Sequence, residues 1–569
     1  MNETRNLIIA LALSAAILFG YNYFFPEKYN SATHEKAKQS ISLNAQPTEY
    51  QPEAEYNSRK EYISVKKNKK ISIESPRLSG SLSVVGGALN NLVLKDYRKT
   101  TEPDGPYVDL LHPLGAASPY YANFGWLSQD SSIKMPDQKT VWKASSLKLT
   151  SESPVNLRYE NKQGLVFERL ISIDENYMFT VVQRVKNTSD KLVHLYPYAF
   201  ISQGGHREGA EHMAYYVGPI GVINDSLKET SYEDLLSKRK VEELSKGGWI
   251  GFTDKYWLSA LIPDQGQLYT YEFKSNKNIA TNQEQFYQTS IKGSRISIAS
   301  GETHTLTTHL FAGAKEVSLL DSYEETHGIP SFDRAVDFGW FYIITKPLFY
   351  TLSFLHGYIS NMGICILLLT ILIKLVFLPL ANKSYVSMAR MKALQPKIKA
   401  LQERYGENKT ELNKAMMELY KKEKVNPLSG CLPMIIQIPV FFGLYKVIFI
   451  SIEMRQAPFF GWIHDLSVPD PTTIFNLFGL IPWSPPEFLL IGAWPLIMGA
   501  SMFLQQRMSP QPADPVQGKI MMALPILFTF MFAKFPAGLV IYWTCNNILS
   551  IAQQWFISRN PKVKAAKKK

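Results

Sequence analysis

Long apolar runs constrain this chain more than any other feature of its sequence. Residues 7–25 form one nearly unbroken apolar run, and five more runs lie between residues 359 and 557. A helix rises about 1.5 Å per residue, so roughly 20 apolar residues cross the hydrocarbon core of a bilayer. The mean hydropathy of -0.11 looks globular only because it averages over these blocks. The sequence therefore predicts a polytopic α-helical membrane protein with six spans.

The first run is interpreted as an uncleaved anchor over residues 1–26. It follows Arg5, is longer than the apolar part of a typical signal peptide, and ends in an aromatic cluster. Residues 27–61 are polar and contain Pro47 and Pro52, which is typical of a linker. The five later spans are expected at residues 359–381, 431–452, 488–504, 520–535 and 537–557.

One further apolar segment, at residues 473–480, is left out of the span count. Pro482, Pro485 and Pro486 follow it and interrupt any helix before the run at 488–504. The segment is a candidate for a position in the membrane interface.

Residues 62–330 show the pattern of a large antiparallel β domain. The strand-like runs 165–173 and 177–185 are separated by turn residues, and further strand patterns lie at 81–94, 256–262, 269–273 and 295–298. Because such hairpins need a second sheet to bury their apolar faces, we expect a β sandwich. Helices are expected at 231–246 and 317–326, and residues 331–357 have the aromatic and charged mixture of a helix lying on the membrane.

The basic residues gather in two places, which indicates the topology. Residues 381–428 hold eleven lysines and arginines against five acidic residues, and the tail 559–569 holds six with no acidic residue. The positive-inside rule places both in the cytoplasm, and counting spans then places the N terminus in the cytoplasm and the β domain outside. The same basic patches also suit anionic lipid headgroups or an RNA-rich partner.

The basic loop after the second span has helical periodicity in two arms, 385–404 and 410–423, separated by Gly406. We expect a helical hairpin over residues 383–425. Its methionines give it a soft apolar surface, which serves either ordinary packing or adaptable contact with many sequences; these are Met388, Met391, Met416 and Met417.

A lysine lies within the apolar span 359–381. Lys374 shares one helix face with Gly363, Leu367 and Thr370, at spacings of three and four. A buried ammonium costs several kcal/mol without a partner or water, and the cores of the later spans contain no aspartate or glutamate. Lys374 therefore either reaches the interface or lies in a hydrated cavity.

Two other lysines compete with Lys374 for this interpretation. Lys446 and Lys534 lie toward the outer ends of their spans, where reaching the interface is the default. Polar residues on other spans favour Lys374, since Gln437 lies in one span and Tyr542, Asn546 and Ser550 recur every fourth residue in the last. These side chains either line a shared cavity with Lys374 or hold helices together by hydrogen bonds.

Other kinds of site find little support. The three cysteines, Cys365, Cys431 and Cys545, lie in apolar runs, so we predict neither a disulfide framework nor a metal site. His206, Arg207, Glu208, Glu211 and His212 lie in a glycine-punctuated segment that is interpreted as a surface loop. The sequence shows no convergent carboxylate pair of the kind that an enzyme acting on saccharides would use, so an enzyme is not predicted. A transporter or channel is the alternative, although intramembrane carboxylates and inverted repeats are not evident.

Four long blocks of sequence resemble one known family. They read SMARMKALQPKIKALQERYG, KVNPLSGCLPMIIQIPVF, RQAPFFGWIHDLS and FPAGLVIYW, and together they resemble the YidC/Oxa family of membrane protein insertases over about residues 330–560. The resemblance implies a five-helix insertase core over residues 358–558 and a periplasmic β-supersandwich domain. It also implies a bacterial inner-membrane protein that inserts and helps fold other membrane proteins, has no cofactor and is not an enzyme.

The resemblance further implies a hydrophilic groove that is open to the cytoplasm and to lipid. On this chain the groove residues are Lys374, Thr370, Gln437, Tyr542, Trp543, Asn546 and Ser550. Implied partners are nascent membrane proteins, the Sec translocon, membrane lipids and, through the basic regions, the ribosome and the signal recognition particle receptor; direct DNA binding is not expected.

The chain departs from the family pattern at two positions. Bacterial members commonly have arginine where Lys374 stands, and lysine keeps the charge but loses the bidentate fork. A paired-tyrosine pattern in the last span is replaced by Tyr542 and Trp543, which keeps an aromatic face.

Overall fold

The computed structural model describes residues 70–559, with gaps at 114–115, 117, 206–214, 277–285, 340, 406–407, 424, 426–431, 480, 482, 484, 487–489 and 510–514. These described residues all belong to one compact unit. The expected anchor 1–26, the linker 27–61, the loop from His206 to His212, Cys431 and residues 560–569 of the tail lie outside them.

The β domain contains two sheets, and the larger one runs in the order β14-β17-β18-β11-β5-β3-β2-β1-β7, with β19 paired to β11 and β4 paired to β3. Its strands are β1 (Lys70–Glu74), β2 (Leu78–Ser83), β3 (Leu89–Arg98), β4 (Tyr107–Leu111), β5 (Tyr120–Leu127), β7 (Lys148–Leu149), β11 (Val193–Gly204), β14 (Lys240–Lys246), β17 (Leu268–Asn276), β18 (Phe286–Gly293) and β19 (Ile296–Ile298).

The second sheet runs in the order β13-β12-β15-β16-β20-β10-β9-β8-β6. Its strands are β6 (Lys143–Ala144), β8 (Val155–Glu160), β9 (Leu165–Ile173), β10 (Met178–Asn187), β12 (Gly218–Ile223), β13 (Ser226–Glu229), β15 (Trp249–Thr253), β16 (Trp257–Ile262) and β20 (Thr303–Ala314).

The hairpin β9–β10 shows how the sequence produces this sandwich. The two strands pair antiparallel with Ile171 opposite Val181, and both side chains are buried in the core between the sheets. Asp174 shapes the turn, because its Oδ1 accepts hydrogen bonds from the backbone N–H groups of Asn176 and Met178, each at 2.9 Å. The predicted hairpin and sandwich are confirmed.

The helix expected at residues 231–246 is wrong over its second half. Helix α3 covers only Tyr232–Lys238 and ends at Arg239, whose φ of 61° leaves the helical region. The next residues form β14 at the edge of the larger sheet, where Lys240 Nζ lies 2.7 Å from Glu272 Oε2 on β17. An edge strand that alternates charged side chains lacks the apolar alternation by which strands are recognised in a sequence.

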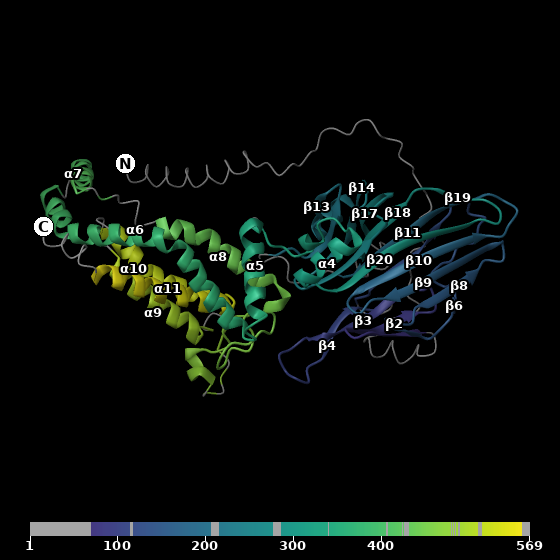
Figure 1. Ribbon diagram of the computed structural model, residues 1–569, viewed down its shortest axis with the longest axis horizontal. Helices are drawn as coiled ribbons and strands as arrows, with labels where there is room; N and C mark the ends of the chain where they lie inside the picture. The colour runs from purple at the N-terminus through teal and green to yellow at the C-terminus, as the bar shows by residue number, and fades with distance from the viewer. Residues whose placement is uncertain are drawn as a thin grey trace. The chain divides into compact units, whose positions relative to one another are not determined.

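The C-terminal part of the described chain is helical (Figure 1). Its α-helices are α4 (Val317–His327), α5 (Tyr342–His356), α6 (Met362–Tyr405), α7 (Lys409–Lys422), α8 (Leu432–Ile450), α9 (Ala493–Met508), α10 (Pro515–Phe532) and α11 (Ala537–Arg559). Short 3-10 helices are η2 (Phe332–Ala335), η4 (Ile452–Met454) and η5 (Ile474–Gly479). Helix α11 packs against α9, α6 and α8, and α10 packs against α9.

Two boundaries differ from those expected. The span 359–381 and the first hairpin arm 385–404 form one continuous helix, α6, of 44 residues, which contains Pro379 and Pro396. The membrane-surface helix expected within 331–357 begins only at Tyr342, because residues 332–335 form η2 and residues 336–339 are not helical. Helix α4 agrees with the expectation for residues 317–326.

Within the described residues, α6 is the helix that is both long and apolar enough to cross a membrane, whereas the apolar stretches Gln437–Ile450 and Gly518–Phe532 are shorter. The helices α8 to α11 nevertheless begin no more than five residues from the starts predicted for the last four spans. The count of six spans stays a prediction.

Candidate functional site

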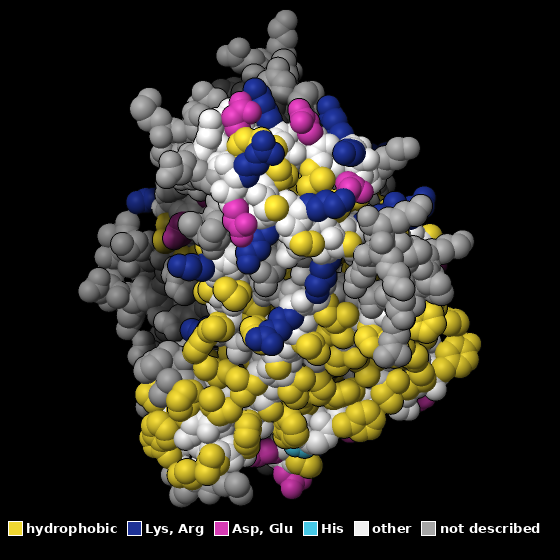
Figure 2. All heavy atoms as spheres, turned by 90° about the vertical axis from the view of Figure 1, so that its left-hand side faces the viewer, with side chains coloured by type: hydrophobic (Ala, Val, Ile, Leu, Met, Phe, Trp, Pro, Cys, Tyr) yellow, Lys and Arg dark blue, Asp and Glu magenta, His cyan; other side chains and the backbone are white. Residues whose placement is uncertain are grey.

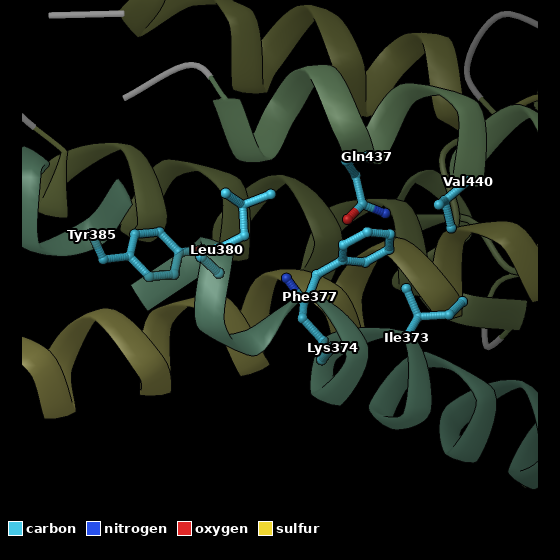
Figure 3. Close-up of a pocket in the computed structure, with 8 residues that line it drawn as sticks. Ile373, Lys374, Phe377, Leu380, Tyr385, Gln437 and Val440 are labelled. Carbon is cyan, nitrogen blue, oxygen red and sulfur yellow. The ribbon is translucent and has the colours of Figure 1, made fainter. Parts of the chain in front are cut away.

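A pocket opens beside α6 and α8, in the half of α6 that carries Lys374. Its lining is mostly apolar and consists of Ile373, Lys374, Phe377, Leu380, Ala381, Tyr385, Gln437 and Val440. Figure 3 shows Lys374 from α6 and Gln437 from α8 extending from opposite walls toward the same space. No carboxylate is among the lining residues that the structure describes. The pocket is therefore an apolar recess with one cation and one amide.

The ammonium of Lys374 is held by the last helix. Its Nζ donates a hydrogen bond to Ser550 Oγ at 2.8 Å, and Ser550 Oγ donates in turn to the backbone carbonyl of Asn546 at 2.8 Å. The Ser550 hydroxyl thus links the Lys374 ammonium to a backbone carbonyl of the last helix. Because an ammonium has three donors, this bond leaves capacity for a ligand or water.

Gln437 and Tyr542 form the second polar contact of the site. The Gln437 side-chain N–H donates to the Tyr542 hydroxyl, which joins α8 to α11. Tyr542 is almost completely buried, so its hydroxyl orients the Gln437 amide rather than lining the open space. The structure thus brings Lys374, Ser550, Gln437 and Tyr542 to one junction of three helices.

Other predicted groove residues lie away from the open space. Thr370 is buried and its hydroxyl donates to the Ile366 carbonyl of its own helix at 2.7 Å. Trp543 packs edge-on against Phe441 at a ring-centroid distance of 4.7 Å, within the helix bundle. Asn546 is buried and reaches the site through its backbone carbonyl. Thr370 and Trp543 support the walls.

Part of the polar pattern on the last span holds helices together. Asn547 Nδ2 donates to Ser501 Oγ of α9 at 2.9 Å, and Gln553 Nε2 donates to Asn382 Oδ1 of α6 at 2.7 Å. Hydrogen bonding between helices therefore accounts for Asn547 and Gln553 of this helix.

The competing lysine Lys446 has a different environment. Its Nζ lies 2.8 Å from Asp337 Oδ2, in the segment that leads to α5. Lys446 thus forms an ion pair with a carboxylate outside the bundle, whereas Lys374 faces the pocket.

The hairpin methionines divide into two groups. Met391 and Met416 pack against the small core formed by Leu394 and Ile398 of α6 and by Val425. Met417 is exposed and Met388 is half-buried. Ordinary packing thus accounts for one pair, and the other pair is available for contact.

The outer surface of the hairpin is basic. Figure 2 shows lysine and arginine side chains spread above a broad hydrophobic surface on the side of the molecule where α6 and α7 end. Exposed basic side chains on these helices are Arg390, Lys392, Lys397, Lys399, Arg404, Lys414, Lys421 and Lys422. Lys392 Nζ donates to the carbonyls of Arg507 and Met508 at 3.2 and 3.3 Å, which caps the C-terminal end of α9.

The apolar lining of the pocket was missed by sequence reasoning. Ile373, Phe377, Leu380 and Ala381 surround Lys374 along α6, and Tyr385 lies three turns beyond it. Continuing the Lys374 face toward the C-terminal end of α6, at spacings of three and four, would have found Phe377 and Ala381. No group of metal-binding side chains occurs among the described residues.

Comparisons with known proteins agree with this architecture. The model of the 60Kd inner membrane protein family matches residues 354–565, and the model of the YidC periplasmic domain matches residues 70–351. Membrane protein insertase YidC of Rickettsia canadensis is 48% identical over 566 residues, covering 98% of this chain and 99% of that protein. Membrane protein insertase YidC of Rickettsia prowazekii is 46% identical over 560 residues, with the same shares covered.

Among solved structures, an active YidC insertase with its first transmembrane domain resolved aligns at a TM-score of 0.37 and 17% identity, covering 85% of this chain and 92% of that one. The family assignment rests on the sequence matches.

A sheet sandwich joined to a helical membrane region, with a lysine-bearing pocket among the helices, defines the class of inner-membrane proteins with a periplasmic domain. Within that class, the chain belongs to the YidC/Oxa family of membrane protein insertases.

Proposed function

We propose that this chain inserts membrane proteins through the pocket around Lys374, without covalent catalysis. Membrane protein insertion is the function that membership of the family supports. The observation that carries the proposed route is the Lys374 ammonium, which has a hydroxyl partner at 2.8 Å and faces a pocket lined without a carboxylate. A cation in this setting attracts the acidic or polar part of a passing segment.

The physical advantage of such a pocket is a lower desolvation barrier. Moving polar groups from water into hydrocarbon without hydrogen bonds costs several kcal/mol each. A recess that presents a cation and an amide within the membrane shortens this path, while the apolar segment of the client partitions into lipid and supplies the driving force. The open shape and mixed lining of the pocket suit a groove open to cytoplasm and lipid.

The pocket residues have separate roles in this proposal. Lys374 attracts and solvates the polar part of the client, and Gln437 offers it an amide whose position Tyr542 fixes. Ser550 and Asn546 hold the ammonium, while Thr370 and Trp543 shape the surrounding wall. Met388 and Met417 of the hairpin receive the incoming chain with adaptable apolar contact.

The proposed topology comprises six spans, with both termini in the cytoplasm and the β domain in the periplasm. Residues 1–26 are the anchor, 27–61 the linker, 62–330 the periplasmic domain, 331–357 the surface helix, 358–558 the five-span core and 559–569 the basic tail. The basic exposed surface of the hairpin supports its placement in the cytoplasm.

Nascent membrane proteins are the proposed clients. The Sec translocon is the proposed companion for some of them, and the ribosome, the signal recognition particle receptor and anionic lipids are proposed partners of the basic cytoplasmic regions. A transporter or channel is not favoured, because the relatives are named insertases and the pocket lining lacks a carboxylate.

Charge reversal at Lys374 tests the route. In cells depleted of their own insertase, Lys374→Glu should lower insertion of clients with acidic translocated segments by on the order of tenfold, about 1.4 kcal/mol in the barrier. Lys374→Arg should retain insertion, because attraction requires charge rather than geometry.

The matched control is Lys534→Glu, which reverses the charge of an exposed lysine just after α10. It should insert the same clients normally. Normal insertion by Lys374→Glu, at equal protein levels, would disprove the proposed role of the pocket.

A further inference from the structure

The connection between α8 and α9 carries an exposed apolar tip, which is formed by the described residues 473–479, 481 and 483. Residues 471–486 contain no charged side chain and no histidine. Phe475, Leu477, Phe478, Ile481 and Trp483 are all exposed, with Leu477 and Phe478 each at 53%. Contiguous exposed apolar surface of this kind marks a contact site.

The backbone of the tip is bent so that these side chains point outward. Leu477 and Phe478 have φ values of 51° and 58°, two successive non-glycine residues in the left-handed region. Each such residue costs on the order of 1–2 kcal/mol. Local hydrogen bonds hold the bend, since Phe478 N donates to Thr473 O at 2.8 Å and Ile481 N donates to Asn476 O at 3.0 Å. Such strain persists only where the surroundings determine it.

Asp470 fixes the base of the tip to the start of α9. Its buried carboxylate accepts from Trp462 Nε1 at 3.1 Å, from Thr472 N at 3.0 Å and Thr472 Oγ1 at 2.7 Å, and from Trp494 N at 2.9 Å. Thr472 Oγ1 also accepts from Ala493 N at 3.0 Å. Asp470 and Thr472 thus cap the first turn of α9 and set the direction of the tip.

The exposed surface of α9 and the composition of the tip indicate the environment in which the tip lies. Ile497, one turn into α9, is exposed, as are Phe503 and Leu504 farther along, so the helix that follows the tip also carries exposed apolar side chains. The stretch 471–486 is too short to cross a bilayer and contains prolines at 482, 485 and 486. Uncharged, aromatic-rich segments beside helix ends are typical of the membrane interface.

We propose that this tip inserts into the periplasmic leaflet of the membrane as a lipid-binding element whose direction Asp470 sets. Phe475, Leu477, Phe478 and Ile481 enter the acyl boundary, and Trp483 lies at headgroup depth. The tip fixes the outer ends of α8 and α9 to one leaflet, on the side of the bundle opposite to the basic hairpin. This inference does not depend on the role of Lys374.

Spin-label accessibility tests the tip directly. The full chain, with Cys365, Cys431 and Cys545 replaced by alanine, receives a nitroxide at Phe478→Cys and is reconstituted into vesicles of phosphatidylethanolamine and phosphatidylglycerol. The matched control is Leu244→Cys, because Leu244 is an equally exposed apolar residue on the edge strand β14. Relaxation by oxygen, which concentrates in lipid, is compared with relaxation by a water-soluble nickel chelate.

We expect oxygen to relax the label at position 478 more strongly than the nickel chelate does. At position 244 we expect the nickel chelate to relax the label more strongly than oxygen does. Adding Asp470→Asn should raise the mobility of the label at 478, because the cap on α9 loses its charge. Equal, water-like accessibility at 478 and 244 would overturn the proposal. Shielding of 478 from both reagents would also overturn it, since a protein partner or a second copy of the chain would then cover the tip.

Discussion

Lys315 and Lys374 show how differently the β domain and the helical region use a cation. Lys315, at the end of β20, is only 4% exposed, and its Nζ donates to Thr253 Oγ1 at 2.9 Å and to the Ala335 carbonyl at 3.1 Å. Lys374, in α6, is half-buried and donates to Ser550 Oγ beside a pocket. Lys315 is enclosed by fixed acceptors of the protein, whereas Lys374 borders a pocket in which a ligand can bind.

The difference separates structural from functional use of charge. A cation enclosed by fixed acceptors contributes to folding, and removing it leaves those acceptors unpaired. A cation that faces an open recess contributes little to folding and is available to a ligand. We therefore expect variants of the two lysines to affect different measurements.

Truncation of Lys315 should have the largest effect on stability. Lys315→Ala leaves the Ala335 carbonyl without its partner and creates a cavity, for a cost of about 3 kcal/mol. For a domain of this size the melting temperature should fall by roughly 6–10 °C. Thermal unfolding of the purified full chain in detergent measures it, and an unchanged melting temperature would contradict the structural role of Lys315.

The second prediction concerns Glu453, a buried acid where the loop after α8 meets α4. Its Oε1 accepts from Val317 N at 3.3 Å, and burial beside Glu316 raises the pKa of Glu453 to about 7. The folded state therefore binds a proton more readily than the unfolded state. The resulting stability is present below about pH 4.5 and is lost as pH rises through about 7.

Glu453→Gln isolates this contribution. The melting temperature of the unmodified chain should fall from pH 5 to pH 8 more steeply than that of Glu453→Gln, because glutamine carries no titrating proton. The difference between the two curves is the measurement, since other titrating groups cancel. Parallel curves would show that Glu453 titrates normally.

Lys374→Met should have the smallest effect on stability. Ser550 Oγ still donates to the Asn546 carbonyl, so no buried donor is left unpaired. The melting temperature should change by about 1 °C or less, while insertion of dependent clients falls as for Lys374→Glu. A large loss of stability would place Lys374 with Lys315 and remove the contrast between the two regions.

The sequence indicates those parts of the fold in which periodicity and burial agree. Strands β9 and β10 alternate apolar and polar residues, so their hairpin was predictable. Helix spacing also placed Lys374 near the polar stripe of the last span, and Ser550 of that stripe is its partner. The resemblance of four sequence blocks added the family.

Other features depend on contacts that periodicity does not encode. Strand β14 is charged on its alternating positions and is a strand only because β17 pairs with it. The continuity of α6 through Pro379 was hidden because composition changes from apolar to basic at the same place. The burial of Thr370 and the packing of Trp543 against Phe441 depend on which helices surround them, so the sequence could not separate wall residues from lining residues.

Photo-crosslinking to a nascent chain tests the central claim most directly. A photoreactive amino acid is placed at position 377 or 437 in the pocket, at position 370 in the buried wall, or at Ile548, an exposed apolar residue of α11, with Lys374 kept in every variant. With a stalled nascent membrane protein, we expect strong crosslinks from 377 and 437 and weak ones from 370 and 548. Crosslinks from 548 equal to those from 377 and 437 would contradict insertion through the Lys374 pocket.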